Sequence, residues 1–292
     1  MRTAIEPIAT DVGALLASAA RRLRDSLPAG DDCTPELDAE LLLSQVLGVS
    51  RARLRSHPEV VPDGALLERF AQLTERRAAG EPIAYLLGRK GFWTLELAVG
   101  PAVLVPRPET ELLVERALAL HPRTFARVAD LGTGSGAIAL ALAQERPLWQ
   151  VTATDVSADA LAIARANALA LGLERVQIIP GSWLAGLQGR VFDLLVSNPP
   201  YVAEDDPAMR SLSYEPRLAL TPGADAMACL REIIRTAPDH LARGGWLLLE
   251  HGATQASAVA GELAARGFVT VRSHRDLAGH ERMTEGQWPK VP

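Results

Sequence analysis

The sequence predicts an α/β protein in which a doubly wound, mostly parallel sheet follows a small N-terminal helical bundle. From Arg127 onward, short apolar runs typical of strands alternate with longer segments of helical periodicity. A glycine-rich stretch, residues 132–136, lies where the first of these strands gives way to a helix. Residues from about 10 to 80 instead carry apolar side chains at helical spacing, separated by capping residues.

Capping residues delimit the N-terminal helices. Asp11 is placed to cap the first helix, and Thr34-Pro35 combines an N-cap residue with a first-turn proline for the second. Gly48 is expected to end that second helix, and Asp63 and Gly80 bracket a third. Helices this short bury little surface alone, so they are expected to pack together as a bundle.

The pattern changes between the bundle and the alternating region. The run Phe92–Leu97 favours a strand over a helix, and glycines before it punctuate the chain. We therefore expect a β-hairpin linker over residues 83–105. It would join an N-terminal helical domain, residues 1–82, to a C-terminal domain, residues 106–292.

The C-terminal domain is expected to open with a helix from Pro106 to about Leu120, followed by strands and helices in alternation. The predicted strands are 127–131, 150–155, 175–180, 192–197 and 245–250. The predicted helices lie near 136–146, 157–171, 225–241 and 255–265. Phe268–Ser273 and roughly Glu281–Gln287 are expected to add two closing strands.

Charge disfavours a nucleic acid as the main partner. The net charge is -5, and the first 90 residues hold 12 basic and 13 acidic side chains against 18 and 22 in the remainder. A protein that grips a phosphate backbone is expected to show a basic excess. Stable nucleic-acid binding is therefore not expected.

The remaining composition points to a reducing compartment without membrane attachment. No apolar run approaches the roughly 18–20 residues that a membrane span needs, and the N-terminus lacks an apolar signal region. Cys33 and Cys229 lie far apart, which favours reduced thiols and a cytoplasmic location. The six histidines show no metal-ligand spacing, so no metal site is expected.

The glycine-rich loop has the form of a cofactor-binding turn. Its candidate cofactor-binding residues are Gly132, Thr133, Gly134, Ser135 and Gly136. Glycines allow a ligand to approach the backbone closely, and the following helix N-terminus offers unpaired N–H groups. Asp155, at the end of the second strand, is placed to accept hydrogen bonds from ribose hydroxyls. A dinucleotide site has the same pattern, and a plain strand–helix turn also remains open at this point.

The tetrapeptide Asn198-Pro199-Pro200-Tyr201 distinguishes among these interpretations. It follows the fourth strand, and the carboxyl ends of parallel strands line one ligand crevice. Asn198 is therefore expected to face the same crevice as Gly132 and Asp155. A turn that merely ends a strand needs neither the second proline nor the tyrosine.

The residue types of this tetrapeptide suit methyl transfer to a planar nitrogen. Such a nitrogen is a poor nucleophile because its lone pair is delocalised. The Asn198 side-chain oxygen and the Pro199 carbonyl would each accept one N–H hydrogen and stabilise developing positive charge. Pro200 helps to hold that carbonyl rigid, and Tyr201 would stack on the planar group. The methyl donor expected from this chemistry is S-adenosylmethionine, whose sulfonium methyl is already activated, with S-adenosyl-L-homocysteine as product. Trp183, after the third strand, is placed to pack against an adenine, although a core tryptophan explains it almost as well.

With these residues assembled, the chain closely resembles the peptide chain release factor N5-glutamine methyltransferases, the PrmC/HemK family, over most of its length. The segments that carry the resemblance are Glu81-Pro82-Ile83-x-Tyr85-x-x-Gly88, Pro106-Arg107-Pro108-Glu109-Thr110-Glu111, the glycine loop, Asn198–Tyr201, Glu215-Pro216-x-x-Ala219-Leu220 and Asp276-Leu277-x-Gly279. The tetrapeptide alone is shared with DNA adenine and rRNA guanine methyltransferases.

The resemblance implies the class I S-adenosylmethionine-dependent methyltransferase fold, a Rossmann-like, mostly parallel seven-stranded sheet with an N-terminal helical bundle. It implies N5-methylation of the glutamine in the Gly-Gly-Gln motif of class I release factors, which tunes translation termination. The residues that it assigns to the cofactor are Gly132 to Gly136, Asp155, Trp183 and Asn198. It assigns Asn198, Pro199 and Tyr201 to catalysis and Asn198 to Tyr201 to the glutamine amide. The bundle would help to dock the release factor, and a monomer is expected.

Two departures from the family pattern and two alternatives remain. Ser182 stands where many members carry an acidic residue, which leaves the adenine amino contact open, and Asp225-Ala226-Met227 replaces a commoner Asp-Gly-Leu. One alternative is methylation of nucleic-acid amino groups at DNA adenine N6 or rRNA guanine N2, and another is a dinucleotide-binding oxidoreductase or binding module. The long connection Val202–Gly223 is expected to cover the substrate.

Overall fold

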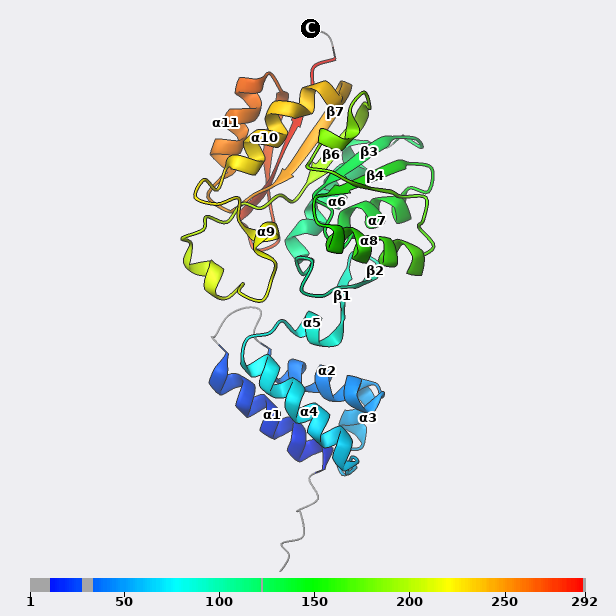
Figure 1. The fold of residues 1–292 in the computed structure, drawn as a ribbon, viewed down its shortest axis with the longest axis vertical. Coiled ribbons are helices and arrows are strands. Elements are labelled where there is room, and N and C mark those ends of the chain that lie inside the picture. The colour runs from blue at the N-terminus through cyan, green and yellow to red at the C-terminus, as the bar shows by residue number, and fades with distance from the viewer. Residues whose placement is uncertain (1–10, 28–33, 122, 291–292) are drawn as a thin grey trace, which may run out of the picture. The chain divides into compact units, whose positions relative to one another are not determined.

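The structure, a computed structural model, describes residues 11–27, 34–121 and 123–290. The chain forms two compact units that meet in sequence between Gly88 and Arg89 (Figure 1). This boundary falls inside the segment expected to link two domains, residues 83–105. The helical start of that segment belongs to the first unit and the hairpin to the second. Cys33 lies outside the described residues.

The first unit is helical, as predicted. Its described helices are α1 (Val12–Ser26), α2 (Pro35–Leu47), α3 (Arg51–Ser56), α4 (Gly64–Ala78) and α5 (Ile83–Leu87). The Asp11 side chain accepts a hydrogen bond from the Ala14 N–H at 2.8 Å, which confirms the predicted N-cap. Gly48 ends α2 in the left-handed conformation with φ 64°, also as predicted. One apolar cluster contributed by α1 to α5 forms the core of this unit.

Two short helices in this unit, α3 and α5, were not predicted. Helix α3 begins three residues after Gly48, and the Ser50 hydroxyl caps it by accepting from the Arg53 N–H. Helix α5 begins directly after Pro82. Each is shorter than two turns, so its apolar residues are too few to show a helical period.

The second unit is built on one twisted sheet. Its described strands are β3 (Arg127–Leu131), β4 (Gln150–Asp155), β5 (Gln177–Pro180), β6 (Phe192–Ser197), β7 (Leu241–Glu250), β8 (Val269–Arg275) and β9 (Glu281–Gln287). Their order in the sheet is β5-β4-β3-β6-β7-β9-β8. The strands from β5 to β7 run parallel, whereas β9 is antiparallel to both of its neighbours. All seven predicted strands are present, and four of them, β3, β4, β6 and β9, have the predicted bounds.

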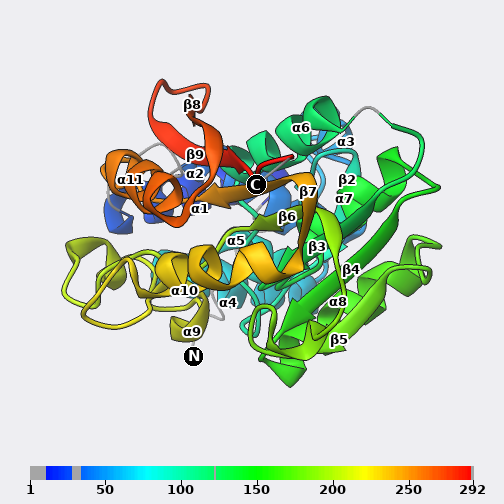
Figure 2. The same cartoon turned by 90° about the horizontal axis from the view of Figure 1, so that it is seen from above.

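Helices cover both faces of this sheet (Figure 2). The helices of the second unit are α6 (Glu111–Leu120), α7 (Ala137–Glu145), α8 (Ala158–Ala170), α9 (Arg217–Leu220), α10 (Ala228–Thr236) and α11 (Ala256–Arg266). Single-turn 3₁₀ segments add η1 (Pro108–Thr110), η2 (Ala185–Leu187), η3 (Pro207–Arg210) and η4 (Ala237–His240). Predicted helix 225–241 is shorter than expected because Pro238 cannot donate a helical hydrogen bond, and α10 gives way to η4 there.

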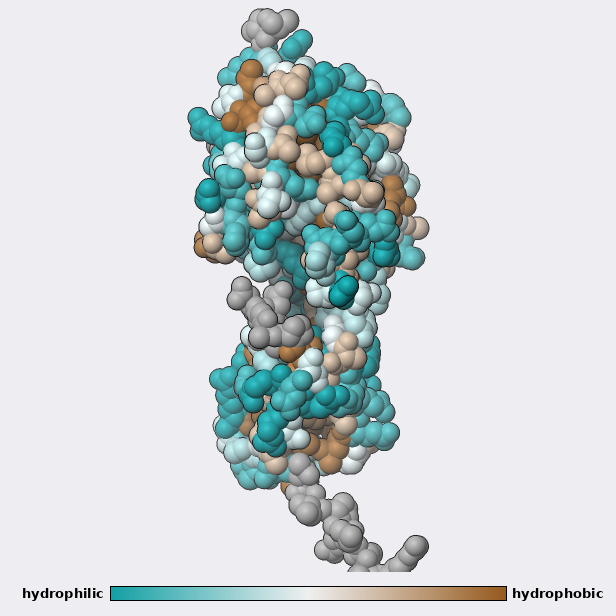
Figure 3. Space-filling view, turned by 90° about the vertical axis from the view of Figure 1, so that its left-hand side faces the viewer, coloured by the Kyte–Doolittle hydropathy of each residue, from teal (hydrophilic) through white to brown (hydrophobic). Residues whose placement is uncertain are grey.

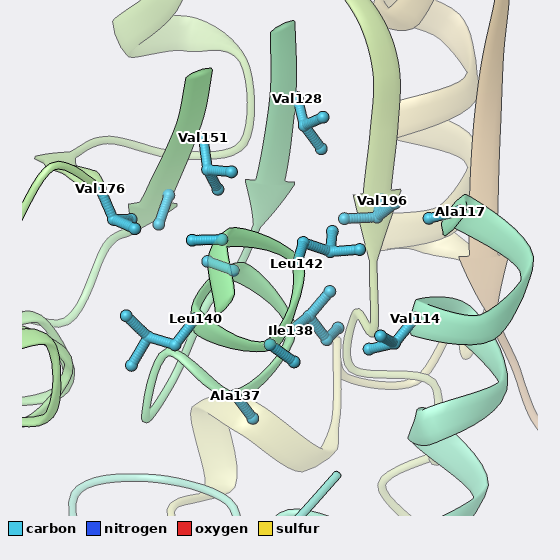
Figure 4. Packing of buried hydrophobic residues seen from close by; sticks show 14 of the residues in the cluster. Val114, Ala117, Val128, Ala137, Ile138, Leu140, Leu142, Val151, Val176 and Val196 are labelled. Carbon is cyan, nitrogen blue, oxygen red and sulfur yellow. The ribbon is translucent and has the colours of Figure 1, made fainter. Parts of the chain in front are cut away.

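Alternate residues of the central strands point into two separate cores. Val128 of β3 and Val196 of β6 pack against α6 and α7, which contribute Val114 and Leu142 (Figure 4). The residues next to them in the strands, such as Ala129, face the second core, which lies under α10 and α11. A central strand that is buried on both faces is a continuous apolar run, which explains why these strands were predictable.

The predicted hairpin is present, but its turn lies inside the run that was predicted as a strand. Strands β1 (Arg89–Phe92) and β2 (Leu95–Ala98) pair antiparallel, and the run Phe92–Leu97 is interrupted by a turn. Trp93 in this turn has φ 55°. Its backbone N–H donates to Glu111 at 2.8 Å, and its indole N–H donates to Glu145 at 2.8 Å. These tertiary bonds stabilise a conformation that local propensity disfavours.

The described residues contain neither a membrane-spanning helix nor a cluster of potential metal ligands. No helix in the described ranges is long and apolar enough to cross a membrane. Within the same residues, no group of three or more potential metal ligands comes together. On the face shown in Figure 3, hydrophobic residues form small patches separated by hydrophilic ones.

Candidate active site

The candidate site lies at the carboxyl edge of the sheet, where the order of strands reverses. The chain proceeds from β3 outward through β4 to β5 and then crosses back to β6 on the other side of β3. Ligands of open α/β sheets bind at this kind of switch point. The Ser197 hydroxyl at the end of β6 donates to the Leu131 carbonyl at the end of β3 at 2.6 Å. Gly132 and Asn198 are the first residues after these two strands, and they therefore leave the sheet side by side.

Backbone hydrogen bonds shape the glycine loop after β3. The Gly132 and Thr133 N–H groups both donate to the Thr154 carbonyl of β4, at 2.8 and 2.9 Å. The Gly134 N–H donates to a carboxylate oxygen of Asp155 at 2.9 Å, and the other oxygen of Asp155 accepts from the Ser157 N–H. Asp155 therefore belongs to the same constellation as the loop, at the edge where the sequence placed it.

Gly132 and Gly134 both have positive φ, 75° and 55°, but only one of them is crowded. A Cβ added to Gly132 would lie 2.9 Å from the Trp183 ring, whereas one added to Gly134 would meet nothing within 4 Å. Trp183 itself has φ 49°, and its carbonyl accepts from the Thr154 hydroxyl at 2.9 Å. The ring of Trp183 thus lies against the loop backbone at Gly132, half-buried, and also packs against the second core.

The Asn167 side chain of α8 forms hydrogen bonds that support the glycine loop, a role that was not predicted from the sequence. This side chain is 3% exposed. Its Nδ2 donates to the carbonyls of Ser135 and Ala98, at 2.9 and 3.0 Å, and its Oδ1 accepts from the Ala98 N–H at 2.7 Å. One carboxamide therefore joins the glycine loop to the β1–β2 hairpin.

Asp130 is a buried carboxyl beneath the loop. One of its oxygens accepts from the Thr133 hydroxyl at 2.6 Å and from the Ala139 N–H at 3.2 Å, and the other has no hydrogen-bond partner among the described residues. Burial raises the pKa of Asp130 to about 7, against the lowering effect of these hydrogen bonds. The carboxyl fixes the first turn of α7 from inside the protein.

Both ends of the tetrapeptide contact polar groups inside the protein. The Asn198 Nδ2 donates to the Thr110 hydroxyl at 3.1 Å, and the Tyr201 hydroxyl donates to Glu250 at 3.2 Å. The Thr110 hydroxyl lies close enough to Glu250 to lower the pKa of that carboxyl, as a hydrogen-bond donor does, although no hydrogen bond of regular geometry joins the two. Thr110 is 4% exposed and Glu250 2%. The Asn198–Thr110 and Tyr201–Glu250 pairs are therefore neighbours, and neither Thr110 nor Glu250 has a role predicted from the sequence.

The carboxyl of Glu250 sits in an unusual electrostatic environment. Burial raises the pKa of Glu250 to about 7, while the hydrogen bonds from Thr110 and Tyr201 lower it. Burial, and then the nearby Glu250, also raise the pKa of the Tyr201 phenol above its ordinary value. Tyr201 therefore remains a neutral hydrogen-bond donor. Its backbone carbonyl accepts from the Gln255 side chain at 3.2 Å, which anchors the same residue a second time.

The long connection Val202–Gly223 is tied down at three points. At its base, the Val202 N–H donates to the Leu220 carbonyl at 3.0 Å, and the Glu204 N–H to the Gly223 carbonyl at 3.2 Å. Farther along, buried Glu215 accepts from the Val105 N–H at 2.9 Å and forms an ion pair with Arg107. The Pro-Arg-Pro-Glu-Thr-Glu and Glu-Pro segments noted in the sequence are thus in direct contact.

We expect Arg107→Ala to loosen this connection. The Glu215 side chain is 3% exposed, so removing its partner leaves a buried carboxylate without a cation and lowers the free energy of unfolding by roughly 2–3 kcal/mol, somewhat less than for a fully buried pair. Trypsin should then cleave faster after Arg210 and Arg217, which are exposed. Glu204→Ala, which breaks the exposed Arg217–Glu204 pair, is the control and should change neither property. Equal cleavage rates in both variants would contradict this role.

The structure brings most of the predicted site residues to one edge of the sheet. The glycine loop, Asp155 and Trp183 are joined by the bonds and contacts above, and the tetrapeptide leaves the neighbouring strand beside them. Ser182 is exposed, and its carbonyl accepts from the Ala185 N–H within the η2 turn. Thr110 lies within the Pro-Arg-Pro-Glu-Thr-Glu segment that carries the family resemblance, so the sequence holds a signal for it, whereas Glu250 ends an apolar strand with no motif around it.

Comparison with known proteins assigns families to both units. The PrmC N-terminal domain matches residues 14–88, and the methyltransferase small domain matches residues 108–215. A methyltransferase structure from Pyrococcus furiosus aligns with a TM-score of 0.52 at 20% identity, covering 75% of this chain and 99% of that one. This likeness concerns the fold, which is the class I methyltransferase fold with an N-terminal helical domain.

Two relatives match nearly end to end. The release factor glutamine methyltransferase of Pseudomonas aeruginosa is 49% identical over 269 residues, which cover 91% of this chain and 97% of the relative. The protein of the same name from Xylella fastidiosa is 48% identical over 279 residues, which cover 94% and 98%. Identity at this level over both units shows that the chain belongs to the release factor glutamine methyltransferase family.

Proposed function

We propose that this enzyme transfers the methyl group of S-adenosylmethionine to the side-chain amide nitrogen, N5, of the glutamine in the Gly-Gly-Gln motif of class I release factors. The observation that carries the proposal is the placement of Asn198 directly beside the glycine loop, fixed by the 2.6 Å bond between Ser197 and Leu131. The glutamine of a release factor is the acceptor because curated relatives at 48–49% identity carry that substrate in their names.

The residues around the glycine loop fit the proposed cofactor. The half-buried carboxylate of Asp155 accepts one backbone bond at each oxygen and keeps lone pairs for hydroxyl groups of a ribose. The open space over Gly134 lets a ligand approach the backbone closely. Bound there, S-adenosylmethionine supplies a methyl group that its sulfonium already activates. The proposed contacts are Gly132, Thr133, Gly134, Ser135, Gly136, Asp155, Trp183 and Asn198.

Asn198 has its carboxamide turned so that it can accept a hydrogen bond from a substrate. Its Nδ2 is engaged by Thr110, and the two ends of a carboxamide point in different directions, so Oδ1 faces away from Thr110. We assign Oδ1 and the Pro199 carbonyl as acceptors for the two N–H hydrogens of the glutamine amide. Two fixed acceptors favour a pyramidal, positively charged nitrogen over the planar ground state, which lowers the barrier to transfer.

The other residues of the tetrapeptide position the acceptor. Pro199 and Pro200 restrict the backbone, so little reorganisation accompanies transfer. The hydroxyl of Tyr201 is held by Glu250, which fixes the ring whose face we assign to the planar amide. We also propose that the N-terminal unit docks the release factor and that Val202–Gly223 covers the glutamine. The enzyme would act as a monomer in the cytoplasm, where translation terminates.

A transfer assay tests the proposal. Radiolabelled S-adenosylmethionine is incubated with the protein and, separately, with unmodified release factor, the same factor with its motif glutamine changed to alanine, rRNA or duplex DNA. We expect label only in the unmodified factor, at the glutamine. The near-neutral charge of the first 90 residues disfavours the nucleic-acid alternative, which needs a basic track. Label in rRNA or DNA, or label that persists in the alanine variant, would overturn the proposal.

A further inference from the structure

Glu250 at the end of β7 is a buried acidic residue without an ion-pair partner among the described residues. Its oxygen Oε1 accepts from the Tyr201 hydroxyl, and Oε2 is buried without a hydrogen bond of regular geometry. A buried carboxylate with so few partners costs free energy of folding. Such a cost commonly marks a functional role.

The directions of the hydrogen bonds around Glu250 fix the orientation of Asn198. The Thr110 hydroxyl has one proton, and one of its lone pairs already accepts from Asn198 Nδ2. Because an ionised carboxylate only accepts hydrogen bonds, the proton of Thr110 is expected to point toward Glu250, whose pKa this hydroxyl lowers. Thr110 then has only lone pairs left to offer Asn198. A carboxamide turned by 180° would place Oδ1 against those lone pairs, so the carboxylate keeps Nδ2 toward Thr110.

We propose that Glu250 and Thr110 are positioning residues for methyl transfer, which turn the Asn198 side-chain oxygen toward the acceptor nitrogen and hold the Tyr201 ring through its hydroxyl. This inference rests on the proposed function, because it assumes that Asn198 receives the acceptor. It places both ends of the Asn198–Tyr201 segment under the control of a single buried carboxylate.

Turnover should depend on the ionisation of Glu250. The groups that act on it are Glu109 and Arg282, by charge, and Thr110 and Tyr201, by hydrogen bonds. Burial raises the pKa of Glu250 to about 7, so the carboxyl becomes protonated as the pH falls through 7. The protonated carboxyl can itself donate a hydrogen bond, which allows the Thr110 hydroxyl to turn its proton away from Glu250 and toward Asn198. The wild-type rate should fall below pH 7. The pKa of Asp130 is also raised to about 7, so a variant without the Glu250 carboxyl is needed to show how much of the pH dependence comes from Glu250.

Three variants test the positioning role by single-turnover transfer to unmodified release factor. Thr110→Val and Glu250→Met remove the hydroxyl and the carboxylate while keeping similar volumes, and we expect each to slow transfer by about 10- to 100-fold. Affinity for S-adenosylmethionine should change less than about threefold, since the contacts of these two residues are with Asn198, Tyr201 and each other and not with the glycine loop. Thr110→Ser keeps the hydroxyl and should restore most of the rate. The decline below pH 7 should be weaker in Glu250→Met than in the wild type.

Coupling to Asn198 separates positioning from a general loss of structure. In an Asn198→Ala background, Thr110→Val should cause little further loss, because its effect passes through the missing carboxamide. An equal fold loss in both backgrounds would overturn the proposal, as would wild-type turnover in Glu250→Met or no rescue by Thr110→Ser.

A spectroscopic measurement keeps this test independent of the substrate. The chain has two asparagines, so the Asn198 side-chain amide resonances are identified by their loss in Asn198→Asp. Both Thr110→Val and Glu250→Met should shift these resonances, and unchanged resonances would refute the positioning role. If the wild type transfers no methyl to the release factor while the resonances still respond, the proposed function fails and the positioning role stands.

Discussion

Asn198→Ala is expected to lower the turnover number about 10²- to 10³-fold while S-adenosylmethionine still binds. That range corresponds to about 2.7–4 kcal/mol, the typical effect of losing one fixed hydrogen-bonding group at a transition state. The Asn198 carboxamide contacts Thr110 and is not part of the bonds that shape the glycine loop. Asn198 is one of eight proposed cofactor contacts and the other seven remain, so we expect the Kd for the cofactor, measured by calorimetry, to change less than about threefold. The loss should appear in kcat rather than in KM for the cofactor.

The chain's other asparagine supplies a matched control. Asn167→Ala removes the three hydrogen bonds by which this side chain joins the glycine loop to the hairpin, and leaves the carbonyl of buried Ser135 without this donor. We expect this variant to be less stable and to bind S-adenosylmethionine more weakly, with a smaller effect on kcat once the cofactor saturates. Turnover near the wild-type level in Asn198→Ala would refute the role assigned to Asn198, whatever Asn167→Ala does.

The main-chain conformation of this site could be predicted because it is determined by residues that are close together in the sequence. The predicted bounds of β3, β4 and β6 coincide with the observed ones, since each strand is almost wholly buried and is followed by a turn residue or ends at an acidic one. The topology of a parallel sheet then places the ends of neighbouring strands at one edge without further information. Glycine, proline and asparagine after those strands carry conformational meaning that a single sequence reveals.

The supporting side chains could not be predicted in the same way. Glu250 ends an apolar strand, and nothing in its neighbours shows that Thr110, 140 positions earlier, lies beside it. Trp93 has a side chain that favours strands, yet bonds to Glu111 and Glu145 hold it in a turn with positive φ. Such pairings depend on tertiary contacts between distant segments, and tertiary contacts override local propensity.

Gly132→Ala is expected to weaken binding of S-adenosylmethionine about 10- to 100-fold while leaving kcat at saturation less affected. The backbone at Gly132 has φ 75°, a conformation that costs an L-residue about 1–2 kcal/mol. The new methyl group would also lie 2.9 Å from the Trp183 ring, which must move away. The loop relieves this strain by relaxing, and cofactor binding must then restore the original conformation. The cost of the substitution is therefore expected in the Kd, which calorimetry measures.

Gly48→Ala separates backbone strain from the crowding at Trp183. Gly48 has a similar φ of 64°, but a Cβ added there meets nothing within 4 Å, and the residue ends a helix of the other unit. This variant should lose about 1 kcal/mol of stability and bind the cofactor normally. If Gly132→Ala also binds S-adenosylmethionine normally, the proposal that the loop backbone approaches the cofactor closely is wrong. The pair of Gly132→Ala and Asn198→Ala then has opposite expected signatures, one in affinity and one in rate, because one residue shapes the loop and the other faces the acceptor.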